Sequence, residues 1–348
     1  MKKIDKILVI RMSALGDVAM TIPVIYSFAK LNPECQITVL TRPFFAKLFL
    51  NKPETITLRI IDPKGEHKGI MGLFRIIREL RREKFDAVAD LHNVLRSWII
   101  TFVLGLCGAK CVTVHKHRMR RRYLIRRSNK DLRPHKSFVM RYVSVFEKLG
   151  FKMRLNFTSL FGKEKGDKSL LPTEITSALD GGNCIGVAPF ARYATKTLPA
   201  HITEQVVEAL SRQGYKVMLF GSKGSEQDVL ESWQNKYEGV LSLPGKLEMS
   251  QELIVMSHMK LMLTMDSSNM HLASLVGTKV VSVWGSTMPH CGFLGYNQNW
   301  DDCITSGSPC QPCSIAGVAK CPNGTLQCLN NISSEKILKH IELLINKK

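Results

Sequence analysis

Short apolar runs alternate along the chain with longer segments in which apolar residues recur every three or four positions. In the first half, the runs predict strands at residues 6–12, 36–41, 58–62, 87–91 and 111–115. Helical spacing is found between or after them, at residues 18–31, 44–50, 70–83, 94–105 and 136–149. Buried strands separated by amphipathic helices are typical of βαβ units, which build a parallel sheet with helices on both faces.

The alternation resumes after a polar stretch, residues 152–180, which contains Gly and Pro and lacks periodicity. The pattern therefore predicts an α/β protein with two doubly wound, Rossmann-like domains, at residues 1–165 and 181–332. The second series has strands at residues 184–189, 216–221, 240–243, 261–265 and 280–284 and helices at 202–213, 226–233, 249–258, 268–276 and 334–345.

Apolar segments long enough to cross a bilayer are not expected from this sequence. The nearest candidate, residues 98–109, is too short for a span and predicts a buried helix instead. Asp5, Lys6 and Arg11 interrupt what would have to be the core of a signal peptide. The chain has 348 residues, of which 45% are hydrophobic and 22% charged, as expected for two globular domains in the cytoplasm.

The strongly positive charge of the chain indicates that its partners are anionic. The formal net charge is +20, and residues 110–141 contain twelve Lys or Arg and a single acid. Nucleic acid, an anionic membrane face and a phosphorylated ligand all fit such a block. The apolar residues among its arginines would let it lie on a membrane, whereas the motifs of nucleic-acid-binding modules are missing. We therefore expect no nucleic acid, and take Arg120 and Arg122 as candidate contacts to a phosphorylated acceptor.

The turn after the first strand contains Ser13, Gly16 and Asp17, immediately before a helix. A strand, a turn with Gly and a helix N-terminus bring these residues to the carboxyl edge of a sheet, where open α/β sheets keep their sites. Gly16 allows the backbone to approach a ligand. Asp17 either caps the helix or serves as a catalytic carboxylate.

A second turn follows the strand at residues 261–265. The N–H groups of its first helical turn are unpaired and lie at the positive end of the helix dipole, so they suit a phosphate. An acid beside a phosphate is unfavourable, so Asp266 is expected to cap the helix or orient hydroxyl groups. The candidate donor-binding residues of this turn are Asp266, Ser267, Ser268, Asn269 and His271.

The two turns together resemble motifs of glycosyltransferase family nine, the lipopolysaccharide heptosyltransferase family. The first is similar to R-x-S-x-x-G-D, through Arg11, Ser13, Gly16 and Asp17. The second is similar to D-[ST]-x-x-x-H-[LI]-A, which begins here at Asp266. The resemblance implies a GT-B fold, with two domains facing a central cleft and the C-terminal helix, residues 333–348, packing back on the first domain.

For function, the resemblance implies inverting transfer of a heptose from an ADP-sugar to a lipid-linked inner-core acceptor of lipopolysaccharide, at the cytoplasmic membrane face. Asp17 matches the family's proposed base. Lys196 matches a lysine that neutralises the leaving phosphate, with Arg192 and Thr195 assisting, although Leu198-Pro199 replaces the usual Trp-Pro. The competing interpretation is an ordinary surface loop.

Two further stretches give weaker signals. Asp90 and Arg96 match a family segment that borders the acceptor, but Asp90 could equally cap the following helix. Glu226 could bind the nucleotide ribose, by analogy with Rossmann-type sites, or simply favour the dipole of its helix.

Metal and cofactor requirements follow from what the motifs contain. No D-x-D motif is present, and enzymes of the GT-B class generally need no catalytic cation, so no cofactor is expected. Cys310 and Cys313 form a C-x-x-C pair, and Cys321 and Cys328 follow, so a structural zinc site is a minor alternative. For the chain as a whole, a nucleotide-sugar epimerase or hydrolase of the same fold, or a basic nucleic-acid-binding protein, would also fit the sequence.

Overall fold

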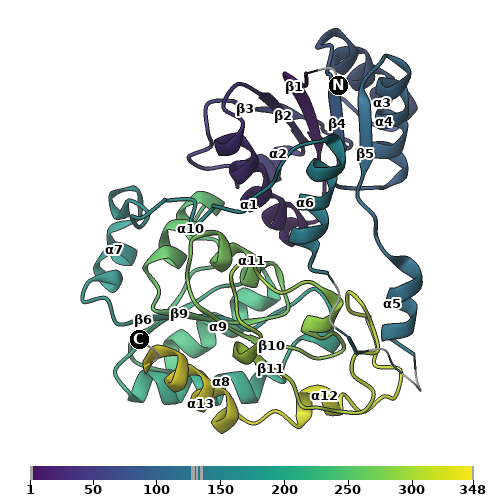
Figure 1. Ribbon diagram of the computed structural model, residues 1–348. Helices are drawn as coiled ribbons and strands as arrows, with labels where there is room; N and C mark the ends of the chain where they lie inside the picture. The colour runs from purple at the N-terminus through teal and green to yellow at the C-terminus, as the bar shows by residue number, and fades with distance from the viewer. Residues whose placement is uncertain (1–2, 127–129, 131, 134–135, 347–348) are drawn as a thin grey trace. The chain divides into compact units, whose positions relative to one another are not determined.

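The computed structural model describes residues 3–126, 130, 132–133 and 136–346. By their internal contacts the residues form two compact units (Figure 1). The first comprises Met1–Lys116 and Phe138–Leu160, and the second comprises His117–Ser137 and Phe161–Lys348. The basic segment around Arg120 therefore groups with the second unit, whereas the sequence pattern had placed it in the first domain.

The first unit is built on a parallel sheet with the strand order β3-β2-β1-β4-β5. β1 is its central strand, and its apolar residues from Ile7 to Ile10 are fully buried, as expected for a strand covered on both faces. The strand order reverses direction between β1 and β4, which makes that gap the topological switch point. The strands are β1 (Lys6–Ile10), β2 (Gln36–Thr41), β3 (Ile56–Ile60), β4 (Ala87–Asp90) and β5 (Lys110–Thr113).

Helices cover this sheet in two groups. α1 packs beside α6, where Phe28 and Phe146 approach to 4.6 Å between ring centroids. α3 packs beside α4, and their buried residues, such as Ile76 and Ile100, share a core with Leu8 of β1. The helices are α1 (Leu15–Leu31), α2 (Pro43–Ala46), α3 (Gly69–Arg82), α4 (Leu95–Leu106) and α6 (Phe138–Leu149).

The expectation that residues 98–109 form a buried helix is wrong for one side of α4. Ile100 and Leu104 face the core, but Trp98 is 55% exposed and Leu106 is 74% exposed. Apart from Arg96, Ser97 and Thr101, the helix has no polar side chain, yet it packs against the sheet and α3 along only part of its surface.

The second unit repeats the same plan. Its parallel sheet has the order β11-β10-β9-β6-β7-β8, which reverses between β6 and β9. The prediction of two doubly wound, Rossmann-like domains is confirmed. The strands are β6 (Cys184–Ala188), β7 (Lys216–Leu219), β8 (Val240–Ser242), β9 (Leu261–Met265), β10 (Val280–Val283) and β11 (Cys303–Ile304). The longer helices are α8 (Ala200–Arg212), α9 (Ser225–Lys236), α10 (Met249–His258), α11 (Ser268–Leu275) and α13 (Ser334–Asn346).

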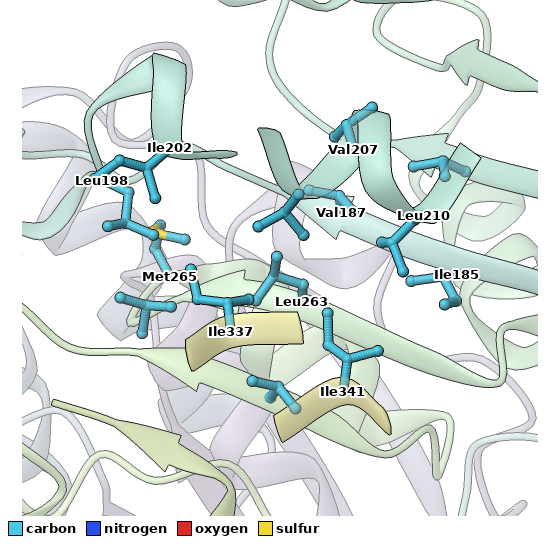
Figure 2. Packing of buried hydrophobic residues seen from close by; sticks show 14 of the residues in the cluster. Ile185, Val187, Leu198, Ile202, Val207, Leu210, Leu263, Met265, Ile337 and Ile341 are labelled. Atoms are coloured by element: carbon cyan, nitrogen blue, oxygen red, sulfur yellow. The ribbon is translucent and has the colours of Figure 1, made fainter. Parts of the chain in front are cut away.

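The C-terminal helix α13 belongs to this second unit. Figure 2 shows Ile337 and Ile341 of α13 among the buried residues of the sheet and α8, near Leu263 and Met265 of β9. Its buried residues recur at four-residue and three-residue intervals, so one side of the helix completes the core. The expected placement of this helix on the first domain is therefore corrected: the structure places it in the second.

Shorter elements were not predicted, because they are too brief to show periodicity. They include α5 (Arg118–Leu124), α7 (Thr173–Leu179), α12 (Gln327–Asn330) and the edge strand β11. Within the described residues, no helix is both long and apolar enough to cross a bilayer.

Candidate active site

Each sheet brings two loops together at its switch point. In the first unit these are the loops after β1 and β4, and in the second unit the loops after β6 and β9. Because the carboxyl ends of parallel strands meet at one edge, residues distant in sequence become neighbours there. The candidate catalytic, donor-binding and acceptor-binding residues identified from the sequence, apart from Glu226, Arg120 and Arg122, lie on or beside these four loops.

Asp17 and Arg11 form an ion pair in the first unit. Asp17 stands in the first turn of α1, and its Oδ2 lies 2.8 Å from Arg11 Nη2 and accepts the Ala14 N–H at 3.4 Å. The guanidinium group of Arg11 also donates to the carbonyl oxygen of Leu91 at 2.7 Å. The Arg11 side chain is 7% exposed, whereas that of Asp17 is 26% exposed. Asp17 thus supports the helix start and still presents a carboxylate to solvent, while Gly16 beside it is half-buried.

His92 faces the same loop and was not singled out from the sequence. Its Nε2 lies 3.0 Å from the hydroxyl oxygen of Ser13, so the two switch-point loops are joined by a hydrogen bond. Burial, reinforced by the positive charges of Arg11, Lys116 and Arg42, lowers the pKa of His92 to about 3. The ring is therefore neutral at physiological pH. The available signal was a histidine two residues after Asp90, the last residue of a buried strand.

Asp90 organises the loop after β4. It is fully buried, and its Oδ1 accepts the backbone N–H groups of His92 and Asn93, each at 2.9 Å. Its Oδ2 accepts the hydroxyl of Ser97 at 3.0 Å. Burial raises the pKa of Asp90, and these hydrogen bonds oppose the shift. The contacts of Asp90 are therefore those expected from the capping alternative. Through them Asp90 fixes the backbone of the loop that carries His92.

Arg96 also contributes to local structure. Its Nη1 donates to the backbone carbonyl of His67 at 3.2 Å, which ties the start of α4 to the loop before α3. Asp90 and Arg96, both expected to contact the acceptor, are thus engaged within the first unit.

The second unit contains a buried ion pair at its switch point. Lys196 Nζ lies 2.8 Å from Asp266 Oδ2, and the two side chains are 13% and 5% exposed. Thr287 donates its hydroxyl to the same carboxylate oxygen. The negative charge of Asp266 is therefore compensated by Lys196, which removes the main objection to an acid beside a phosphate site.

The N-terminus of α11 lies directly after Asp266. Ser267 is the N-cap residue, and its hydroxyl is buried without a hydrogen-bond partner among the described residues. Ser268 and Asn269 open the helix and are half-buried, and His271 is buried one turn in. Free backbone N–H groups, an uncommitted hydroxyl and a neighbouring lysine are the groups that bind a diphosphate.

Three further residues that we expected to bind the donor lie outside the α11 turn. They are Thr195, Arg192 and Glu226. Thr195 is buried, and its hydroxyl donates to the carbonyl oxygen of Val318 at 2.6 Å and accepts from Ser286 at 2.9 Å. Arg192 is exposed and lies over the ring of Tyr193 at 5.3 Å. Glu226 Oε2 accepts the N–H of Ser222 at 2.7 Å, which closes the loop after β7. Thr195 therefore holds the loop that carries Lys196.

Arg120 and Arg122 lie on α5 in the second unit, and both are exposed. Leu124 and Ile125, the apolar neighbours expected to face a membrane, pack instead against Cys291, Ile315 and Phe293.

Four cysteines of the second unit line one cavity of about 490 Å³, next to Lys130, Thr195 and Ser286. Backbone N–H groups, that of Leu326 foremost, lower the pKa of Cys321, whereas burial raises that of Cys313. In the described part of the chain no three His, Cys, Asp or Glu residues are placed to hold a metal ion. The cavity cysteines are Cys310, Cys313, Cys321 and Cys328.

Comparison with solved structures supports the fold. The crystal structure of the glycosyl transferase family 9 from Veillonella parvula has a TM-score of 0.75 and 20% identity, with 99% of this chain and 98% of that chain covered. Escherichia coli ADP-heptose lps heptosyltransferase II has a TM-score of 0.69 and 19% identity, with 98% of each chain covered. The GT-B fold class expected from the resemblance is confirmed.

Comparison of sequences identifies the family. Lipopolysaccharide heptosyltransferase 3 of Escherichia coli is 26% identical over 281 residues, which cover 78% of this chain and 81% of that protein. Residues 73–320, well over half of the chain, match the sequence profile of glycosyltransferase family 9 (heptosyltransferase). The match includes the loop with Lys196 and the α11 turn, while the Asp17 turn precedes it. With the switch-point geometry of both units, this match establishes that the chain belongs to glycosyltransferase family 9, the heptosyltransferase family.

Proposed function

We propose that this protein transfers a heptose from ADP-heptose to an inner-core acceptor of lipopolysaccharide, with inversion at the anomeric carbon and without a catalytic metal ion. The donor and acceptor are suggested by the names of the relatives, one of which is an ADP-heptose enzyme and another a lipopolysaccharide heptosyltransferase. The observation that carries the proposal is Asp17, a partly exposed carboxylate held at a switch point by a buried arginine.

In the proposed reaction, Asp17 accepts the proton of the acceptor hydroxyl as that oxygen attacks the anomeric carbon. Arg11 already binds Oδ2 of Asp17, so Oδ1 is the oxygen available for the proton. The bond from the anomeric carbon to the diphosphate breaks in the same displacement, and ADP leaves. One displacement at that carbon inverts its configuration.

The second unit compensates the charge on the departing diphosphate. Lys196 supplies a positive charge, and the α11 turn supplies backbone N–H groups from Ser268 and Asn269 together with the hydroxyl of Ser267. Such preorganised donors stabilise charge that develops in a transition state. Lys196 must turn from Asp266 toward the phosphate, or share its charge between the two. Thr287 remains a partner for Asp266 in either case.

The base is tested with Asp17→Asn, which keeps the size of the side chain and removes its basicity. We expect transfer to fall by about 10²- to 10⁴-fold, the range of general base catalysis, while ADP-heptose binding measured by calorimetry is unchanged. Glu54→Gln, at an exposed acid of the same unit, is the matched control and should behave as the wild type. Retained transfer by Asp17→Asn would exclude Asp17 as the base.

Acceptor dependence separates transfer from hydrolysis and epimerisation. A hydrolase or epimerase would convert the nucleotide sugar without an acceptor, whereas the proposed enzyme releases ADP at a rate set by the acceptor. We place this reaction at the cytoplasmic face of the inner membrane, where a lipid-linked acceptor would be reached by a protein bound peripherally.

A further inference from the structure

We propose that the outer faces of α3 and α4 form a docking surface for an anionic phospholipid bilayer. This inference deepens the proposed function, because it assigns the membrane contact to a particular surface of the first unit. The α3–α4 surface is defined by seven apolar residues, Ile70, Met71, Phe74, Leu95, Trp98, Phe102 and Leu106.

The outward side of α4 carries the first part of this surface. Leu95, Trp98, Phe102 and Leu106 recur at three- and four-residue intervals and are 54–75% exposed. The rings of Trp98 and Phe102 stack with centroids 5.6 Å apart. A helix in which apolar residues occupy both the inner and the outer side is normally enclosed by protein or lipid, and α4 packs against protein along its inner side only.

The start of α3 extends the apolar area. Ile70, Met71 and Phe74 are 59–81% exposed, on a helix that packs directly beside α4. Singly exposed apolar residues are ordinary, but seven large ones on two adjacent helices indicate an interaction site.

The charges beside these residues favour an anionic partner. Downstream of Phe74, α3 exposes Arg75, Arg78, Arg81 and Arg82. Its acid Glu79 is already paired with Arg59 at 2.7 Å, and α4 contains no acid at all. Apolar residues next to arginines are the composition of a helix lying in a lipid headgroup layer.

A second copy of this chain fits the surface less well. Bringing two α3–α4 surfaces together would place the exposed arginines of α3 from both copies in one interface, where α4 offers no acid and Glu79 is already paired with Arg59. A bilayer supplies phosphate groups for the arginines and a headgroup boundary for Trp98 and Phe102, where aromatic rings concentrate. We therefore commit to the lipid surface.

The basic helix α5 is the weaker candidate for a membrane contact. It exposes two large apolar side chains, Met119 and Tyr123, whereas Leu124 is fully buried in the second unit. The α3–α4 surface exposes seven large apolar side chains next to its arginines.

Flotation of the full-length protein with vesicles tests the proposal. One vesicle is phosphatidylcholine alone, and the other mixes phosphatidylcholine with phosphatidylglycerol. We expect binding to the mixed vesicle, and the triple variant Leu95→Ser, Trp98→Ser, Phe102→Ser should weaken it at least about tenfold, since the removed side chains supply apolar burial. The double variant Leu170→Ser, Leu343→Ser removes comparably exposed residues elsewhere and should bind as the wild type.

Single substitutions of the α3 arginines separate the electrostatic contribution of anionic headgroups to binding from the contribution of apolar contact. Each Arg→Gln change at Arg75, Arg78, Arg81 or Arg82 should weaken binding to the mixed vesicle by about fivefold, the effect of one basic residue near an anionic surface. Added salt should weaken the wild type in the same way, and binding to phosphatidylcholine alone should change little.

Fluorescence gives a readout that does not depend on a multiple variant. Trp98 emission, isolated by subtracting the Trp98→Phe protein, should shift to the blue on mixed vesicles and be quenched by brominated lipid. Unchanged vesicle binding by the triple variant, or no binding by the wild type, overturns the proposal. If the triple substitution instead abolishes a wild-type dimer in sedimentation, the surface is an interface between copies.

Vesicle binding needs neither donor nor acceptor, so it is independent of the proposed reaction. Asp17→Asn should bind vesicles as the wild type. Failure of the transfer assay with intact vesicle binding rejects the function and keeps the surface, and the reverse result rejects only the surface.

Discussion

The two switch points of this protein share one architecture and differ in where their acid is held. In the first unit Asp17 remains partly exposed because a buried arginine approaches it from one side only. In the second unit Asp266 is enclosed and bound by both Lys196 and Thr287. The same edge of the same kind of sheet therefore offers a partly exposed carboxylate in one case and an enclosed, neutralised carboxylate in the other. Burial and pairing, not topology, make the two acids differ.

After Asp17→Asn, the largest effect is expected from removing the cation of the second pair. Lys196→Ala should lower kcat/KM by about 10²- to 10³-fold, the cost of losing one charge-stabilising group, and should also weaken ADP as an inhibitor. Lys216→Ala, at an exposed lysine at the start of β7, is the control. Unchanged inhibition by ADP in the Lys196 variant would contradict a role in binding the diphosphate.

Removing Arg11 tests whether the loop that carries Asp17 is stabilised by the ion pair between the two residues. Arg11→Met eliminates the ion pair with Asp17 and the hydrogen bond to Leu91, and should lower the free energy of unfolding by about 1.5–3 kcal/mol. Urea denaturation measures the change. Asp17→Asn keeps a hydrogen-bond acceptor for Arg11, so it should lower the free energy of unfolding by less than Arg11→Met does. An equal or larger loss in the Asp17 variant would show that Arg11 does not hold the loop.

The pH dependence of stability sharpens the comparison further, because the first switch point contains a buried neutral histidine. The pKa of His92 is lowered to about 3 in the folded protein, so the unfolded chain binds its proton first as the pH falls below about 6.5. Stability contributed by the neutral ring is therefore present above that pH and declines toward acid, by up to about 2 kcal/mol between pH 6.5 and 5. His92→Gln should lose less stability over this interval than the wild type, in parallel urea titrations.

The smallest effect is expected at Ser267. Its hydroxyl has no partner among the described residues, so Ser267→Ala should change the melting temperature little, while donor affinity falls by about three- to tenfold through one lost hydrogen bond. Ser274→Ala is the contrasting variant, because the hydroxyl of Ser274 donates to the carbonyl oxygen of Met270. It should lower the melting temperature and leave donor affinity unchanged. A clear loss of stability in the Ser267 variant would mean that its hydroxyl is structural.

Much of this arrangement is visible in the sequence because strands buried on both faces are almost uninterrupted apolar runs. β1 and β9 were located in this way, and each is followed by its polar turn. The outward side of α4 was not predicted, since a helix apolar on both sides looks the same whether protein covers one side or two. His92 was missed because its neutrality arises from burial and from Arg11, Lys116 and Arg42, which are separated from it or from one another in the chain.

Helix α13 has a consequence for how the protein is made. Its Ile337 and Ile341 complete a core whose other members begin at Ile185, so that core is assembled from residues spread over about 160 positions of the second unit. During synthesis from the N-terminus, the first unit can close once residue 160 has left the ribosome. The second must wait until Ile337 and Ile341 have been synthesised, with apolar sheet surface uncovered in the meantime, and a chain that stops before residue 337 leaves it open.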